Sequence, residues 1–310
     1  INITANANQT KVYGDANPTY TYAIEAAGTS RGLVNSDTFT GALSRASGEN
    51  VNNYAMTQGT LANSNYSINF VADNFEITPK AITLTAPTVT KAYDGLTTYT
   101  VTASNLTSIG SGLVSGDTVT AATISFADKN VATGKTVTLS DVTVSDGNSG
   151  NNYTVTLAGN SSSSITRQTS VTWIGGATGQ WFDPANWAVT GNLSVAGAVP
   201  DLSNVSAVVI ASGKTVTFND AVAGITSPAQ TGAVSITTLS GGGSLTVTNG
   251  SLSGTSLSVT QLNTSAGTTV TASTGFTVAP TTGTTDTIAG VLAGNGTFTK
   301  NGAGTTVLSG

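Results

Sequence analysis

Residues 244–248 read Ser244-Leu245-Thr246-Val247-Thr248 and alternate strictly between hydroxyl-bearing and apolar side chains. The same alternation occurs in Tyr153-Thr154-Val155-Thr156-Leu157 and in Thr215-Val216-Thr217-Phe218. A period of two with β-branched residues is typical of strands that bury one face and expose the other. Helical spacing is nearly absent, and residues 23–27 are the nearest case. The chain is therefore predicted to be all-β, with threonine as the commonest outward-facing residue.

The composition excludes several classes of protein. The 310 residues include no Cys and no His, which excludes His–Cys zinc sites, haem, iron–sulfur clusters, disulfides and His-based triads. Charged residues make up 8% of the chain, against about 25% in ordinary soluble domains. With 10 Lys+Arg against 15 Asp+Glu, the chain lacks the cations that neutralise phosphates, so no nucleic-acid partner is expected. The sequence has no run of apolar residues long enough for a transmembrane segment.

An internal repeat divides the first half of the chain. Lys11-Val12-Tyr13-Gly14-Asp15 matches Lys91-Ala92-Tyr93-Asp94-Gly95, and the Gly-Leu-Val block of residues 32–37 matches that of residues 112–117; both offsets are 80 residues. These matches predict two tandem β-sandwich-like modules, at residues 1–80 and 81–168. Because Pro79-Lys80 leaves little linker between them, an elongated rod is expected rather than beads on a string.

The sequence changes character after residue 168. Residues 171–187 contain all three Trp of the chain, and many short β-like segments follow, separated by Gly, Ser and Asn. Such segments, without charge or long loops, are typical of a parallel β-solenoid (β-helix). We therefore predict a β-solenoid segment at residues 169–310 that begins with a Trp-rich cap. The sequence is still strand-like at Gly310, so further coils or another domain are expected to follow.

These motifs together resemble a known group of proteins. The Lys11–Asp15 and Lys91–Gly95 blocks look like the opening of the MBG and YDG repeats of large bacterial surface proteins, and the two Gly-Leu-Val blocks look like their middle motif. Residues 294–310 look like the autotransporter-associated β-strand repeat. A block similar to the start of β-helical passenger segments is formed by Trp173-Ile174-Gly175-Gly176, Trp181 and Asn186-Trp187.

The resemblance implies a non-enzymatic segment of a large secreted adhesin of the filamentous-haemagglutinin type, exported by two-partner or another type V secretion to the surface of a Gram-negative bacterium. It would act as stalk or binding surface in cell attachment and biofilm cohesion, with exopolysaccharides or cell-surface glycans as partners and without a cofactor. The absence of disulfides suits threading through a pore, and the Thr, Ser and Asn surface offers hydroxyls and amides to sugars. The alternative is an extracellular fibre that self-associates through strand edges without a specific receptor.

The first candidate ligand-binding site is the aromatic block of Trp173, Trp181, Phe182 and Trp187. Aromatic faces stack on the apolar faces of sugars, and neighbouring polar side chains would bond the hydroxyls. Alternatively, the rings bury roughly 150–250 Å² each and close the open start of the solenoid. The capping interpretation is favoured because a solenoid needs terminal caps, whereas a sugar site is optional.

The second candidate is the repeated turn, which pairs a lysine with Tyr13, Gly14 and Asp15 in one module and with Tyr93, Asp94 and Gly95 in the next. It is either a repeated ligand pocket or a structural turn. The glycines permit a positive φ and the aspartates can bond the turn backbone, which favours the structural interpretation.

A third cluster suggests a calcium site, because it offers carboxylate and amide oxygens at Asp141, Asp146, Asn148, Asn151 and Asn152. Its spacing does not match an EF-hand, and an Asn/Gly turn is favoured, so no metal is predicted. No catalytic residue is predicted either. The only acids of the predicted solenoid are far apart in sequence, at Asp183, Asp201, Asp220 and Asp286.

Overall fold

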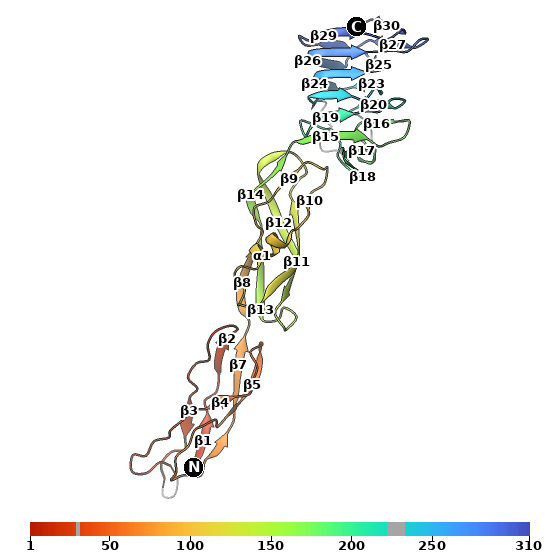
Figure 1. The fold of residues 1–310 in the computed structure, drawn as a ribbon. Coiled ribbons are helices and arrows are strands. Elements are labelled where there is room, and N and C mark those ends of the chain that lie inside the picture. The colour runs from red at the N-terminus through yellow and green to blue at the C-terminus, as the bar shows by residue number, and fades with distance from the viewer. Residues whose placement is uncertain (29–31, 222–232) are drawn as a thin grey trace. The chain divides into compact units, whose positions relative to one another are not determined.

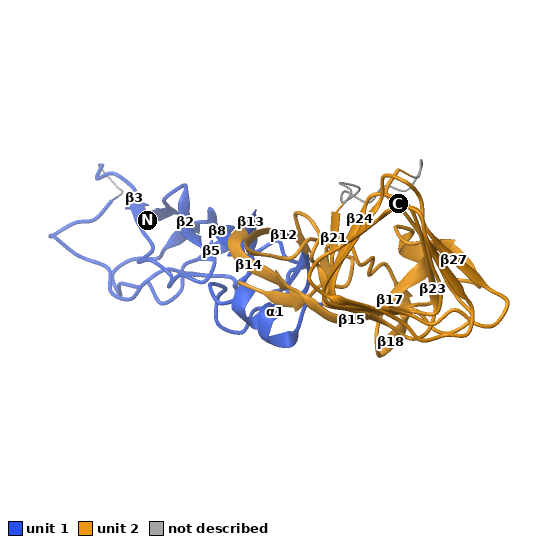
Figure 2. Ribbon diagram, turned by 90° about the horizontal axis from the view of Figure 1, so that it is seen from above, with its two compact units in different colours: residues 1–87, 100–124, 138–159 blue, residues 88–99, 125–137, 160–310 orange. Residues whose placement is uncertain are grey.

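The computed structural model describes residues 1–28, 32–221 and 233–310 (Figure 1). These residues form two compact units, coloured separately in Figure 2. Unit 1 holds residues 1–87, 100–124 and 138–159, and unit 2 holds residues 88–99, 125–137 and 160–310. The only α-helix of the described residues is α1 (Ala103–Ile109). The prediction of an all-β protein is confirmed, and the division into domains at residues 80 and 168 stays a proposal.

Two small sheets occupy the N-terminal part of unit 1. The first has the order β3 (Tyr22–Ile24), β1 (Asn2–Ala5), β6 (Asn69–Val71). The second has the order β2 (Gln9–Val12), β7 (Asn74–Thr78), β5 (Asn52–Thr57), β4 (Ser44–Arg45). Alternate side chains of these strands point inward, so Ile3, Met56 and Phe75 are buried while their sequence neighbours are exposed or half-buried.

The segment after Pro79 uses longer strands. β8 (Lys80–Thr85) pairs in parallel with β13 (Tyr153–Ala158) in unit 1. A five-stranded sheet has the order β10 (Thr98–Tyr99), β11 (Thr118–Phe126), β12 (Ala132–Ser145), β14 (Asn160–Thr166), β9 (Thr90–Ala92). The residues of β11 and β12 are divided between the two units. Helix α1 begins at a capping box, in which Thr102 and Asn105 bond each other's backbone N–H.

From residue 168 onward, unit 2 consists mainly of two parallel ladders (Figure 1). The main strands of the first are β15 (Gln168–Trp173), β19 (Val205–Val209), β22 (Thr238–Ser240), β24 (Ser251–Val259), β26 (Thr269–Val278) and β28 (Val291–Ala293). Also in this sheet are β17 (Trp187–Val189), β18 (Asn192–Ala196), β21 (Ala233–Ser235) and β29 (Thr297–Lys300). The second consists of β16 (Thr178–Gln180), β20 (Thr215–Asn219), β23 (Ser244–Asn249), β25 (Leu262–Thr264), β27 (Thr285–Ile288) and β30 (Thr305–Leu308).

The register of the ladders stacks apolar residues into columns. In the first ladder, successive paired positions are Val171, Val208, Leu239, Leu257, Phe276 and Phe298. In the second, Val216 pairs with Leu245 and Leu245 with Leu262, and all three are fully buried. Parallel strands that add one apolar residue per coil to a common core fit the predicted β-solenoid (Figure 2).

Candidate functional site

The aromatic block lies in the first coil of the ladders, in the interior. Trp173 is 4% exposed, Phe182 is 1% exposed, and Trp181 and Trp187 are fully buried. The rings of Trp173 and Trp187 meet edge to face with centroids 5.1 Å apart, and those of Trp181 and Trp187 lie 5.2 Å apart. Phe218 of β20 contacts both Trp181 and Phe182. The rings therefore form one packed cluster.

Most polar groups around this cluster bond to the protein itself, whereas Gln180 Oε1 is buried without a hydrogen-bond partner among the described residues. Trp181 Nε1 donates to Pro200 O at 3.0 Å, and Trp173 Nε1 donates to Gly176 O at 3.0 Å. Asp183 accepts from Ala185 N at 2.9 Å and thereby caps the short 3₁₀ helix η1 (Pro184–Asn186). Few ring faces remain open to a sugar. This burial suits the capping interpretation, which stays a prediction.

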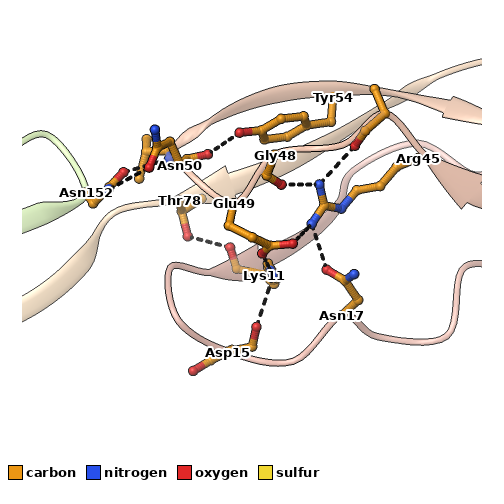
Figure 3. A network of polar contacts seen from close by, with 12 residues as sticks. Lys11, Asp15, Asn17, Arg45, Gly48, Glu49, Asn50, Tyr54, Thr78 and Asn152 are labelled. Atoms are coloured by element: carbon orange, nitrogen blue, oxygen red, sulfur yellow. Dashed lines mark hydrogen bonds and ion pairs between the residues drawn. The ribbon is translucent and has the colours of Figure 1, made fainter. Parts of the chain in front are cut away.

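Ion pairs between charged side chains stabilise the repeated turn of the first module (Figure 3). Lys11 is 8% exposed; its Nζ contacts the Glu49 carboxylate and donates to Asp15 O at 3.0 Å. Arg45 NH2 bonds the other oxygen of Glu49 at 2.6 Å. The hydrogen bond from Lys11, reinforced by Arg45, holds the pKa of Glu49 below its usual range. Lys11 thus stabilises the turn through its hydrogen bond to the Asp15 carbonyl.

The tyrosine of this turn, Tyr13, bonds the carboxylate of Asp117, which lies 104 residues later in the chain. Tyr13 OH donates to Asp117 Oδ2 at 2.9 Å, and Tyr153 OH donates to the same oxygen at 2.5 Å. The two rings meet edge to face, with centroids 5.4 Å apart. Gly14 has φ = 83°, and a Cβ there would lie 2.5 Å from Val114 Cγ2. We call Tyr13, Asp117 and Tyr153 the first tyrosine junction; all three belong to unit 1.

The first tyrosine junction keeps its hydroxyls protonated. Burial and then the Asp117 carboxylate raise the pKa of Tyr13 above its ordinary value. The same two causes raise the pKa of Tyr153. Both shifts have the sign expected when a neutral donor faces an anion in a partly dry site.

Tyr93 makes an equivalent contact inside unit 2. Its hydroxyl donates to Val199 O at 2.8 Å and to Asp201 Oδ1 at 3.2 Å. Gly95, at φ = 81°, approaches Gly197 so closely that a Cβ would lie 1.8 Å from Gly197 O. Burial, followed by the charge of Asp201, raises the pKa of Tyr93. Gly95 therefore cannot gain a side chain without moving the backbone.

Asp201 is fully buried and is held from three sides. Asn204 Nδ2 donates to Asp201 Oδ1 at 2.6 Å, and Lys129 Nζ lies 3.3 Å from Oδ2. Asn204 Oδ1 in turn accepts from Val131 N at 2.8 Å. We call Tyr93, Asp201, Asn204 and Lys129 the second tyrosine junction. It joins residues of the second repeat to the start of the ladders within unit 2.

Sequence reasoning identified the two tyrosines and not their acceptors. The repeated Gly-Leu-Val motif carries Asp117, so the repeat contained a signal for the first acceptor. No comparable signal marks Asp201, which lies between β18 and β19 in a segment without a match in the repeats. Asp15 and Asp94 contribute to the turns in different ways. The backbone carbonyl of Asp15 accepts from Lys11, and the carboxylate of Asp94 accepts from Leu96 N at 2.9 Å.

The Asp/Asn cluster also forms a turn. Asp146 Oδ1 accepts from the N–H groups of Asn148 and Gly150 at 2.8 Å, and Oδ2 accepts from that of Asn152 at 3.0 Å. Burial alone raises the pKa of Asp146, but these hydrogen bonds outweigh it and lower the pKa below its usual value. Asn152 also accepts from Val51 N at 2.9 Å. Within the described ranges, no three acidic side chains gather in a way that could hold a metal ion.

Comparison with known proteins identifies two domains in this chain. A model of the MBG domain (YGX type) matches residues 1–76, and a model of the YDG domain matches residues 78–163. Searches of curated proteins and of solved structures gave no match. Both domains occur in extracellular, adhesin-like surface proteins and are structural or adhesin-type rather than enzymatic. The described part of the chain contains no helix with the length and hydrophobicity of a membrane crossing. The chain thus carries an MBG domain of the YGX type followed directly by a YDG domain.

Proposed function

We propose that this chain is a non-enzymatic stalk segment of a large secreted adhesin, which keeps its modules in a fixed series on the surface of a Gram-negative bacterium. The observation that carries the proposal is how the chain passes from one segment to the next. Only Pro79 separates β7 from β8, and only Arg167 separates β14 from β15. A single residue leaves few backbone torsions free, so neither joint acts as a flexible tether.

Side-chain contacts reinforce both joints. Tyr13 bonds a carboxylate on the far side of the first joint, and Tyr93 does so across the second. At the second joint, the Arg167 guanidinium also donates to Val205 O at 2.9 Å and to Ser235 O at 3.2 Å. These contacts limit bending at the two joints, which supports the role of a stalk in cell attachment and biofilm cohesion.

Small-angle scattering tests the stalk. We expect one narrow distribution of maximum dimension in small-angle scattering of the 310-residue protein. Eight Gly-Ser residues inserted after Pro79 should broaden it. The same insertion between Thr190 and Gly191, both exposed in the turn from β17 to β18, should leave it unchanged. A wild-type distribution as broad as that of the Pro79 insertion would overturn the proposal.

A glycan and exopolysaccharide panel tests whether the segment also binds a surface. Saturable binding would make it adhesive and would direct mutagenesis to a cavity of about 490 Å³ in unit 2, whose lining includes Leu96, Lys129 and Ala185. Absence of binding by the folded monomer would leave it as a spacer that presents another part of the adhesin.

The edge strand β18 favours self-association as a second candidate function. All five of its residues are exposed, and Leu193 and Val195 are 52% and 46% exposed. Among the described residues β18 pairs with β17, at the end of the sheet, which leaves its other edge available for pairing with another chain. Sizing over a range of concentrations should show growing oligomers that disappear in the Val195→Pro variant. A constant monomer would exclude this function.

A further inference from the structure

In the first tyrosine junction, Val114, Asp117 and Tyr153 together receive Tyr13. We call these three residues the acceptor half of the junction. Val114 N donates to Tyr153 OH at 2.8 Å, and Asp117 N donates to Val114 O at 3.0 Å, so a tight turn anchored on Tyr153 presents the Asp117 carboxylate. The turn of the preceding module that contains Tyr13 and Gly14 contacts this acceptor half. Tyr13 bonds Asp117, and Gly14 packs closely against Val114.

The MBG domain contains the same acceptor half. Val34 N donates to Tyr66 OH at 2.9 Å, and Asp37 N donates to Val34 O at 3.0 Å. These bonds repeat, atom for atom and nearly to the distance, those made by Val114, Tyr153 and Asp117. The sequence match between the two Gly-Leu-Val motifs thus extends to a shared local structure.

The two acceptor halves differ in what covers them. Val34 is 56% exposed, whereas Val114 is half-buried against Gly14. Asp37 Oδ2 accepts a long hydrogen bond of 3.3 Å from Asn65 Nδ2, whereas Asp117 Oδ2 accepts the two tyrosine hydroxyls. Among the described residues, no tyrosine hydroxyl bonds Asp37, and Val34 remains exposed, so both are open to an incoming tyrosine turn.

We propose that Val34, Asp37 and Tyr66 form an acceptor site for the Lys-x-Tyr-Gly turn of another MBG-type module. The incoming tyrosine hydroxyl bonds Asp37, its ring packs edge to face on Tyr66, and its glycine covers Val34. This names a partner for the proposed stalk function and rests on it, since the site would extend the series of modules by one.

The test uses an extended protein in which residues 1–79 are duplicated ahead of Ile1. The copied Tyr13 then precedes Asp37 by nearly the 104 residues that separate Tyr13 from Asp117. In this extended protein we expect Asp37→Asn to lower the midpoint of thermal unfolding by about 5 °C. In the 310-residue protein the same substitution should shift the midpoint by less than about 1 °C. Phenylalanine at the copied Tyr13 should reproduce the loss, and the double variant should lose no more than either single one.

A second variant tests whether the effect of Asp37→Asn is specific to the proposed site. Val34→Gln should destabilise the extended protein and leave the 310-residue protein unchanged, because only the extended protein covers Val34. Val71→Gln is the matched control, since Val71 is also exposed in the MBG domain and lies in β6. Equal effects of Asp37→Asn in both proteins, or of Val34→Gln and Val71→Gln in the extended one, would overturn the proposal.

Asp117→Asn separates failure of this inference from failure of the stalk. If Asp117→Asn destabilises the extended protein and Asp37→Asn does not, the acceptor site is wrong while the stalk stands. If neither substitution matters, the tyrosine junctions do not stiffen the chain and both proposals fail.

Discussion

The hydroxyl of Tyr93 bonds the carboxylate of Asp201 across 108 residues of sequence, and both side chains are fully buried. Few charged groups of this chain are enclosed so completely. Burying a carboxylate costs free energy unless its oxygens are bonded, and here Tyr93, Asn204 and Lys129 supply the partners. The contact therefore fixes the tyrosine turn of the YDG domain against the first coil of the ladders.

Removing the carboxylate should be costlier than removing the hydroxyl. Asp201→Asn leaves Lys129 without its counterion and should lower the free energy of unfolding by about 3 kcal/mol. Tyr93→Phe removes a buried hydroxyl whose proton is shared between Val199 O and the Asp201 carboxylate, and should cost about 2 kcal/mol. Chemical denaturation of the 310-residue protein measures both. Tyr99→Phe, on a half-buried tyrosine of the same unit, is the control and should change little.

The first tyrosine junction should make the protein sensitive to alkali. Because burial and Asp117 raise the pKa of Tyr13, the folded state holds this proton more tightly than the unfolded chain does. The stabilisation is complete below the unfolded pKa of about 10 and is lost as pH rises through the folded pKa. Tyr13→Phe should be less stable than wild type at pH 8 and should lose less stability between pH 10 and 11.5. Parallel decline of the two curves would contradict this.

The strands and the modules were predictable because their signals are local. Alternation of side chains depends on neighbours in sequence, as in residues 244–248. The spacing of the tandem motifs indicates two modules, and the motifs themselves resemble those of the MBG and YDG domains that match this chain. The junctions were not predictable, because a contact such as Tyr93–Asp201 depends on how distant segments pack. A lone aspartate in sequence gives no sign of the amide and ammonium that will surround it.

Removing the largest ring of the aromatic cluster should cost stability. Trp181 is fully buried between Trp187 and Phe218, so Trp181→Ala should lower the free energy of unfolding by about 4 kcal/mol through lost burial and the cavity left behind. Thermal unfolding, read together with the glycan panel, checks this. Unchanged melting with loss of glycan binding would instead identify a sugar site and reject the cap.

Calcium should have no effect on the Asp/Asn turn. The carboxylate oxygens of Asp146 already accept three backbone N–H groups, and a cation would have to displace them. We expect no heat in calorimetric titration and no thermal shift in millimolar Ca²⁺. Saturable heat that disappears in Asp146→Asn would show that the turn rearranges into a metal site.

Asp286 should make unit 2 less stable as pH rises. Its side chain lies fully buried in β27, and its Oδ1 has no hydrogen-bond partner among the described residues. Burial raises the pKa of Asp286, against smaller opposing effects of the Leu262 backbone, the Thr306 hydroxyl and Lys300. The folded state therefore favours the protonated acid, and its stabilisation, complete below the unfolded pKa of about 3.9, falls as pH rises through the folded value.

Asp286→Asn removes this dependence, because the amide keeps the shape of the neutral acid and carries no charge. At neutral pH the variant should be more stable than wild type by about 1 kcal/mol, and at pH 3.5 the two should unfold alike. Asp73→Asn, at a half-buried carboxylate of the MBG domain, is the control and should not reproduce the crossover. If Asp286→Asn destabilises the protein at neutral pH, the carboxylate makes a favourable contact as an anion, and the inferred direction of its pKa shift is wrong.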